Sequence, residues 1–187
     1  ETNENRELSR LWFEIIELMR SAIDDNHRLC LFHARLLIRY GEWQDARKIL
    51  QVIIKETGSL GDFEIQSRAL LEMSKLHKLE GDYDKAVAIL NRIDRFQNLQ
   101  KIVTPEHLLQ KSIIAIERQK ADEARQILST IHRNFRADML KCEVEILCGN
   151  FETALHCINE CFENAGNNQY QLSHLHVLLG RIYEGCA

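Results

Sequence analysis

Two stretches of the sequence repeat each other 40 residues apart. RYGEWQDARKIL begins at Arg39, and LEGDYDKAVAIL begins at Leu79. Each passes through a glycine, an acid and an aromatic ring, has an alanine three residues after the ring, and closes on Ile-Leu. An internal repeat restricts the fold strongly, because each unit of a repeat protein buries its apolar face against the next unit.

Two further segments share the pattern, ERQKADEARQIL from Glu117 and LCGNFETALHCI from Leu147. In all four segments an alanine is followed four residues later by Leu or Ile, and the pairs are Ala46 and Leu50, Ala86 and Leu90, Ala124 and Leu128, and Ala154 and Ile158. Three positions further on stand the apolar residues Ile53, Ile93, Ile131 and Cys161. A small residue lets two helices approach closely, so we expect the four alanines at equivalent helix contacts.

The chain is expected to be all-α. It contains one proline, Pro105, and its apolar residues recur at spacings of three and four with almost no strict alternation. About ten helices are predicted, over residues 8–23, 27–40, 42–56, 63–80, 82–95, 105–118, 121–132, 136–147, 151–163 and 171–183. In the first of these, one helical face carries Leu11, Ile15, Leu18 and Ala22.

The loops between these helices are expected to be short. Glycines fall at the predicted turns, where a positive φ is useful. Thr104, Pro105 and Glu106 supply a hydroxyl cap, a proline at the first helical position and an acid beside the positive helix end. One longer connection is predicted over residues 97–103. Short loops favour antiparallel packing of consecutive helices.

At these residues the sequence resembles the tetratricopeptide repeat, a helix-turn-helix unit with L-G-x2-Y in its first helix and A-x3-F in its second. The segment LGRIYE carries the first signature at Leu179, Gly180 and Tyr183. The anchor alanines are spaced by 40, 38 and 30 residues, whereas the family repeat has about 34 residues, and Leu or Ile replaces the signature Phe. The array is therefore degenerate.

The resemblance implies a right-handed superhelical array of antiparallel helix pairs, forming a single domain over residues 1–187. Its repeats are expected at 27–57, 63–96, 105–133, 135–165 and 171–187, the last of them truncated. The sequence begins without an initiator Met or a leader, and we interpret it as a segment of a longer protein.

Composition and motifs exclude several functions. The chain has 24 Lys+Arg against 28 Asp+Glu, a net charge of -4, which gives no general attraction for nucleic acid or anionic lipid. No apolar run approaches the roughly 20 residues that a membrane span requires. Six cysteines in helix-like contexts favour a reducing, intracellular location, cytoplasmic or nuclear. Because no catalytic or phosphate-binding motif is present, we expect neither an enzyme nor a cofactor.

The resemblance also implies a concave face lined by the first helix of each pair, and we expect a protein or peptide partner to bind there. The candidate partner-binding residues are Arg28, Arg35, Arg39, Arg68, Lys75, Lys78, Leu109, Ile113 and Met139. The basic members would grip an acidic peptide, and the apolar members would contact its other side chains. Alternatively, the cations are solvated and paired with neighbouring acids. Charge reversal at Arg35 and Lys75 is predicted to weaken partner capture without lowering the melting temperature.

A cysteine- and histidine-rich stretch raises the question of a metal site. Its members are Cys142, Cys148, His156, Cys157, Cys161, His174 and His176. Cys157 and Cys161 stand four apart, a spacing that can hold zinc. However, Cys161 falls in the inward apolar register and Cys142 at the small position of its helix, where cysteine acts as a compact apolar residue. We therefore expect packing and no metal.

Two classes of function remain open. The first is an interaction scaffold that binds a peptide or helix of a partner, or docks within a multi-subunit complex. The second is a purely architectural segment of a very large protein, similar to the helical repeat regions of cell-cycle ubiquitin ligase subunits or giant kinases. An enzyme regulator of the bacterial sensor type is a third alternative.

Overall fold

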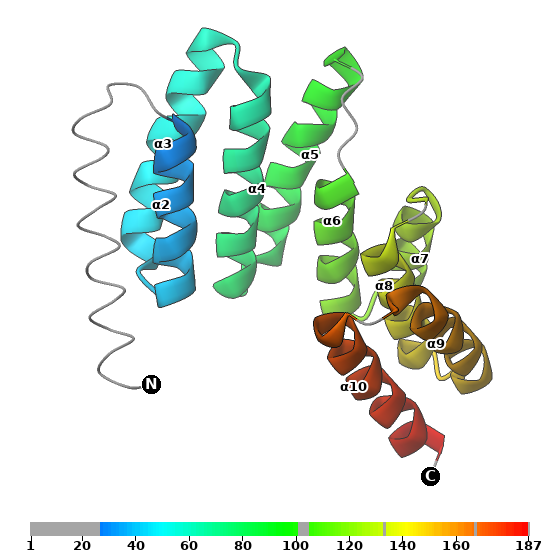
Figure 1. Ribbon diagram of the computed structural model, residues 1–187. Helices are drawn as coiled ribbons and strands as arrows, with labels where there is room; N and C mark the ends of the chain where they lie inside the picture. The colour runs from blue at the N-terminus through cyan, green and yellow to red at the C-terminus, as the bar shows by residue number, and fades with distance from the viewer. Residues whose placement is uncertain (1–26, 101–104, 133, 167, 187) are drawn as a thin grey trace, which may run out of the picture. The chain divides into compact units, whose positions relative to one another are not determined.

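The computed structural model describes residues 27–100, 105–132, 134–166 and 168–186 (Figure 1). All regular structure within these ranges is α-helical. The helices are α2 (His27–Tyr40), α3 (Trp43–Leu60), α4 (Phe63–Leu79), α5 (Tyr83–Gln100), α6 (Pro105–Glu117), α7 (Ala121–Ser129), α8 (Phe135–Leu147), α9 (Phe151–Ala165) and α10 (Gln169–Cys186). The helix predicted over 8–23 and the predicted cap at Thr104 lie outside the described residues.

The chain divides into two compact units, and each is described by itself. The first extends to Ile102 and contains α2 to α5, whereas the second begins at Val103 and contains α6 to α10. In the first unit each helix packs against the next, and α2 also packs against α4. In the second unit α6 likewise packs against α8, and α8 against α10. Helix pairs therefore stack through their first helices, as repeats do.

The four anchor alanines, Ala46, Ala86, Ala124 and Ala154, are all 0% exposed. Each donates its backbone N–H to the carbonyl four residues earlier, at 2.9–3.1 Å. The residues that follow in the same register are buried as well, and they are Leu50, Ile53, Leu90, Ile93, Leu128, Ile131, Ile158 and Cys161. The burial predicted from the repeat is confirmed.

The turn inside each repeat has one backbone geometry. The residue five positions before each anchor alanine has a positive φ, and these are Gly41 (84°), Gly81 (79°), Gln119 (58°) and Gly149 (74°). Three repeats use glycine, which adopts this conformation without a Cβ penalty. The third repeat uses glutamine in the same place. The matching turns show that one supersecondary unit recurs despite unequal spacing.

Gly81→Ala is expected to lower the free energy of unfolding by about 1 kcal/mol. An added Cβ there would have no neighbour within 4 Å, so the cost comes from backbone strain alone. Urea denaturation followed by circular dichroism measures the change. The reverse substitution Gln119→Gly removes such strain and should not destabilise the chain. If Gly81→Ala leaves the free energy of unfolding unchanged, this account of the turn is contradicted.

The predicted ends of four helices were wrong by three residues or more: α7 ends earlier, at Ser129, α10 ends later, at Cys186, and α3 and α5 differ most. Helix α3 runs four residues past its predicted end at residue 56, and in the added turn Thr57 is buried and donates to the Ile53 carbonyl at 2.6 Å. Gly58 serves close approach instead of a turn, since a Cβ there would collide with the Gln66 amide, which donates to the Ile54 carbonyl at 3.0 Å. Helix α5 continues to Gln100, so the long connection predicted from residue 97 starts later.

Candidate functional site

Two candidate cations from different repeats converge on one buried acid. Arg35 Nε of α2 donates to Glu72 Oε1 at 2.9 Å, and Lys75 Nζ of α4 donates to the same oxygen at 3.1 Å. The Glu72 side chain is 7% exposed, against 46% for Arg35. This network ties the first helices of two successive repeats together. It also neutralises part of the basic strip, which consists of the six cations predicted to bind a partner: Arg28, Arg35, Arg39, Arg68, Lys75 and Lys78.

The remaining cations of the strip differ in their pairing. Arg68 pairs with Glu64 at 2.7 Å on the exposed surface of α4, and Lys78 is half-buried in the last turn of that helix. Arg28 and Arg39 are exposed on α2, and neither forms an ion pair with any residue that the structure describes. The side chains of these two arginines can therefore form ion pairs with acidic residues of a partner protein.

The apolar candidates lie in the second unit, and one of them is corrected. Leu109 is 2% exposed and belongs to a core cluster, so its side chain has no surface to present to a partner. The sequence analysis placed Leu109 on the concave surface of the array, where a partner would bind, whereas its side chain is buried in the core of the second unit. Ile113 and Met139 are half-buried and pack against core clusters of the same unit.

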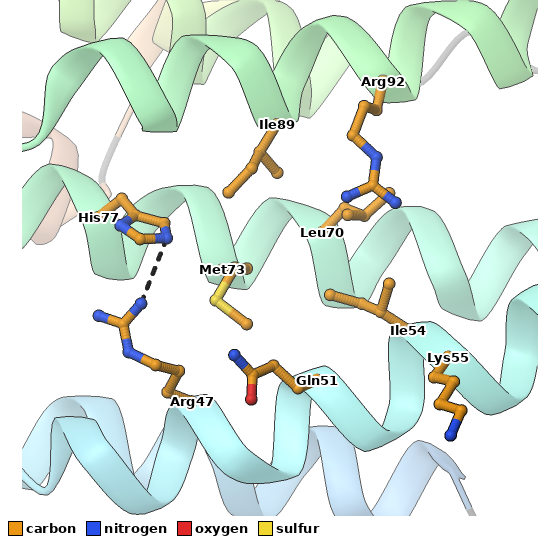
Figure 2. Close-up of a pocket in the computed structure, with 9 residues that line it drawn as sticks. All are labelled: Arg47, Gln51, Ile54, Lys55, Leu70, Met73, His77, Ile89 and Arg92. Atoms are coloured by element: carbon orange, nitrogen blue, oxygen red, sulfur yellow. Dashed lines mark hydrogen bonds between the residues drawn. The ribbon is translucent and has the colours of Figure 1, made fainter.

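A hollow of about 360 Å³ lies in the first unit, and sequence reasoning missed it (Figure 2). Its lining comes from α3, α4 and α5, and consists of Arg47, Gln51, Ile54, Lys55, Leu70, Met73, His77, Ile89 and Arg92. Helix α4 packs against both α3 and α5, whereas the described parts of α3 and α5 do not approach each other closely. The hollow is therefore a gap between two second helices, floored by the first helix between them.

Arg47 is braced at one end of this hollow. Its Nη2 donates to both carboxylate oxygens of Glu80, one of them at 2.5 Å, and its Nη1 lies 3.3 Å from His77 Nε2 (Figure 2). Burial and the Arg47 guanidinium lower the pKa of His77 below its ordinary value. Lys55 and Arg92 are exposed and form no ion pair with the residues described. The sequence signal that could have indicated this hollow is the spacing of Arg47, Gln51 and Lys55 by four residues, which places them on one face of α3.

The cysteine-rich stretch is mostly packing. Cys142 and Cys161 are 0% and 2% exposed, with their sulfurs 3.9 Å apart between α8 and α9. A hydrogen bond with Cys161, together with burial, raises the pKa of the Cys142 thiol. His156 is exposed on α9. Across the described ranges, no group of three or more His, Cys, Asp or Glu is placed to hold a metal ion.

Helix α10 presents apolar side chains to solvent. Tyr170 is 73% exposed, Val177 65% and Tyr183 62%. A Cβ added at Gly180, the signature glycine, would have no neighbour within 4 Å. Contiguous exposed apolar surface commonly marks a site of interaction, and Tyr170 and Val177, seven residues apart, share one face of α10.

Comparison with known proteins supports the fold. The structure is similar to the crystal structure of a tetratricopeptide repeat protein from Parabacteroides merdae, with a TM-score of 0.67 and 16% sequence identity, over 97% of this chain and 71% of that chain. No family model matches the sequence, and no curated protein matches it. The chain therefore has an all-helical repeat fold of the tetratricopeptide type. None of the helices described is both long and apolar enough to cross a membrane.

Proposed function

We propose that this helical-repeat chain is an interaction scaffold that binds an acidic segment of a protein partner on α2. The observation that carries the proposal is the pair of exposed arginines Arg28 and Arg39, which have no ion-pair partner among the described residues and flank Arg35 on one helical face. They stand 11 residues apart, which at 1.5 Å per residue is about 16 Å. An extended peptide spans that distance in about five residues.

The proposal includes a non-catalytic role within a larger complex, inside the cell, in the cytoplasm or nucleus. It is supported by the helical-repeat fold, whose stacked helices offer extended surfaces for other proteins. The cysteines described are unbridged, which fits a reducing compartment. The net charge of -4 favours a protein partner over nucleic acid.

The double variant Arg28→Glu/Arg39→Glu tests the proposal. The probe is a fluorescein-labelled decapeptide of alternating Glu and Ser, with binding measured by fluorescence polarisation. We expect about tenfold weaker binding, since reversal of two exposed contacts removes roughly 1.4 kcal/mol. The melting temperature should stay unchanged, because neither arginine is paired with any residue in the described ranges.

The matched control is Lys48→Glu/Lys85→Glu, which makes the same change in net charge at exposed lysines on α3 and α5. Equal weakening by the control would show that only net charge matters, and the proposal would fail. The substitution of Arg35 and Lys75 suggested by the sequence is less suitable, because both residues hold the buried Glu72.

A second candidate function is a purely architectural one, in which the chain packs against neighbouring domains of a very large protein or complex. The exposed Tyr170, Val177 and Tyr183 of α10 favour it. In capture from lysate, the architectural role predicts that Tyr170→Ser/Val177→Ser abolishes recovery of partners, whereas Arg28→Glu/Arg39→Glu leaves recovery intact. The scaffold role predicts the opposite order of effects.

A further inference from the structure

We propose that the hollow between α3 and α5 is a second binding site, which takes an acidic protein segment that inserts one apolar side chain. This site goes beyond the α2 surface, because its lining comes from α3, α4 and α5 and shares no residue with the basic strip. The class of ligand is inferred from the charge of the lining, from its apolar side chains and from the absence of available backbone N–H donors in the lining.

The charge of the lining selects an anionic partner. The nine lining residues include three cations and no carboxylate. Glu80 compensates Arg47 at the His77 end. Lys55 and Arg92, on the opposing helices α3 and α5, have no counterion among the residues described. An incoming carboxylate would supply the missing charge by charge-assisted hydrogen bonds.

The floor and walls select an aliphatic group. Ile54 and Ile89 are half-buried on the two walls and present the apolar surface that a ligand can reach, whereas Leu70 and Met73 lie beneath them on α4 at 0% and 5% exposure. Methionine adapts its shape to different apolar groups. A volume of about 360 Å³ lies at the low end of ligand pockets and suits one or two side chains of a peptide.

The lining is a poor match for phosphate or nucleotide ligands. All nine residues lie inside helices, so their backbone N–H groups are engaged in helical hydrogen bonds and none is offered to a phosphate as at a helix N-terminus. The lining contains no Phe, Tyr or Trp on which a base could stack. A mixed acidic and aliphatic peptide suits both Lys55 and Arg92, which lack a counterion among the described residues, and the two isoleucines of the walls.

The test uses two fluorescein-labelled decapeptides, one with Leu at every third position among Glu residues and one with Ser in place of Leu. Fluorescence polarisation should show the Leu peptide binding at least about fivefold more tightly than the Ser peptide, since one buried aliphatic side chain is worth this much or more. Lys55→Glu/Arg92→Glu should weaken the Leu peptide about tenfold or more. Gln51→Trp, which fills the hollow from an exposed position without changing charge, should weaken it as well.

The control Lys48→Glu/Lys85→Glu lies on the same two helices outside the hollow and should have a much smaller effect. Three results overturn the proposal: equal affinity for the Leu and Ser peptides, unchanged binding by Lys55→Glu/Arg92→Glu or Gln51→Trp, or equal weakening by the control. Arg28→Glu/Arg39→Glu separates this site from the α2 surface. If the α2 proposal fails while the hollow variants act as expected, only the hollow site stands.

Discussion

Ala86→Leu is expected to lower the free energy of unfolding of the first unit by about 3 kcal/mol, at the upper end of overpacking effects. Ala86 is 0% exposed. Its backbone cannot shift freely, because its N–H donates to the Asp82 carbonyl at 3.1 Å and its own carbonyl accepts the Ser74 hydroxyl at 3.0 Å. The larger side chain must therefore push α4 and α5 apart.

Urea denaturation followed by tryptophan fluorescence measures this effect, since both tryptophans, Trp12 and Trp43, precede the second unit in the sequence. The matched control is Ala88→Leu, an exposed position two residues along the same helix, where the change should stay within about 0.5 kcal/mol. Similar losses for the two variants would show that Ala86 is not the close helix contact that the repeat requires.

Arg35→Ala/Lys75→Ala is expected to destabilise the first unit by about 3 kcal/mol, because it leaves a buried carboxylate without a counterion. Glu72 is 7% exposed and receives both cations on one oxygen. Adding Glu72→Gln to the double variant should recover most of the loss, since the neutral amide needs no counterion. Arg35 is 46% exposed, so solvent already screens part of the interaction.

Chemical denaturation of the double and triple variants measures both effects. Arg68→Ala is the control, because it breaks an exposed pair with Glu64 on the same helix and should cost no more than about 0.5 kcal/mol. If the triple variant is no more stable than the double variant, the buried Glu72 charge is not the cause of the loss.

The helical repeat could be predicted from the sequence because its signals are local. The stretch from His27 to Tyr40 was predicted with the bounds that the structure shows, and so was the start of α6 at Pro105. Periodic apolar residues and turn glycines act within one or two helical turns, so neighbours along the chain suffice to read them. Gly58 misled the prediction because its role depends on Gln66 of the next helix.

The candidate site was harder to predict. Arg28, Arg35 and Arg39 could be placed on one helical face by their spacing, but the spacing does not show which of them has a partner. Glu72, which binds Arg35, stands 37 positions further along the chain. Leu109 was assigned to the concave surface because of its position in the repeat, but it is buried by packing within the second unit.

The sequence by itself determined the helices, the register of the four alanines and the pairing of helices into repeats, because each depends on the order of residues within a short segment. Only the tertiary structure decided which cations are neutralised and where the hollow opens. Both result from the approach of side chains from separate helices, as with Arg47 and Glu80, 33 positions apart. Whether a cation is neutralised and where a hollow opens both depend on which helices pack together. A pattern within one short segment therefore does not predict either of them.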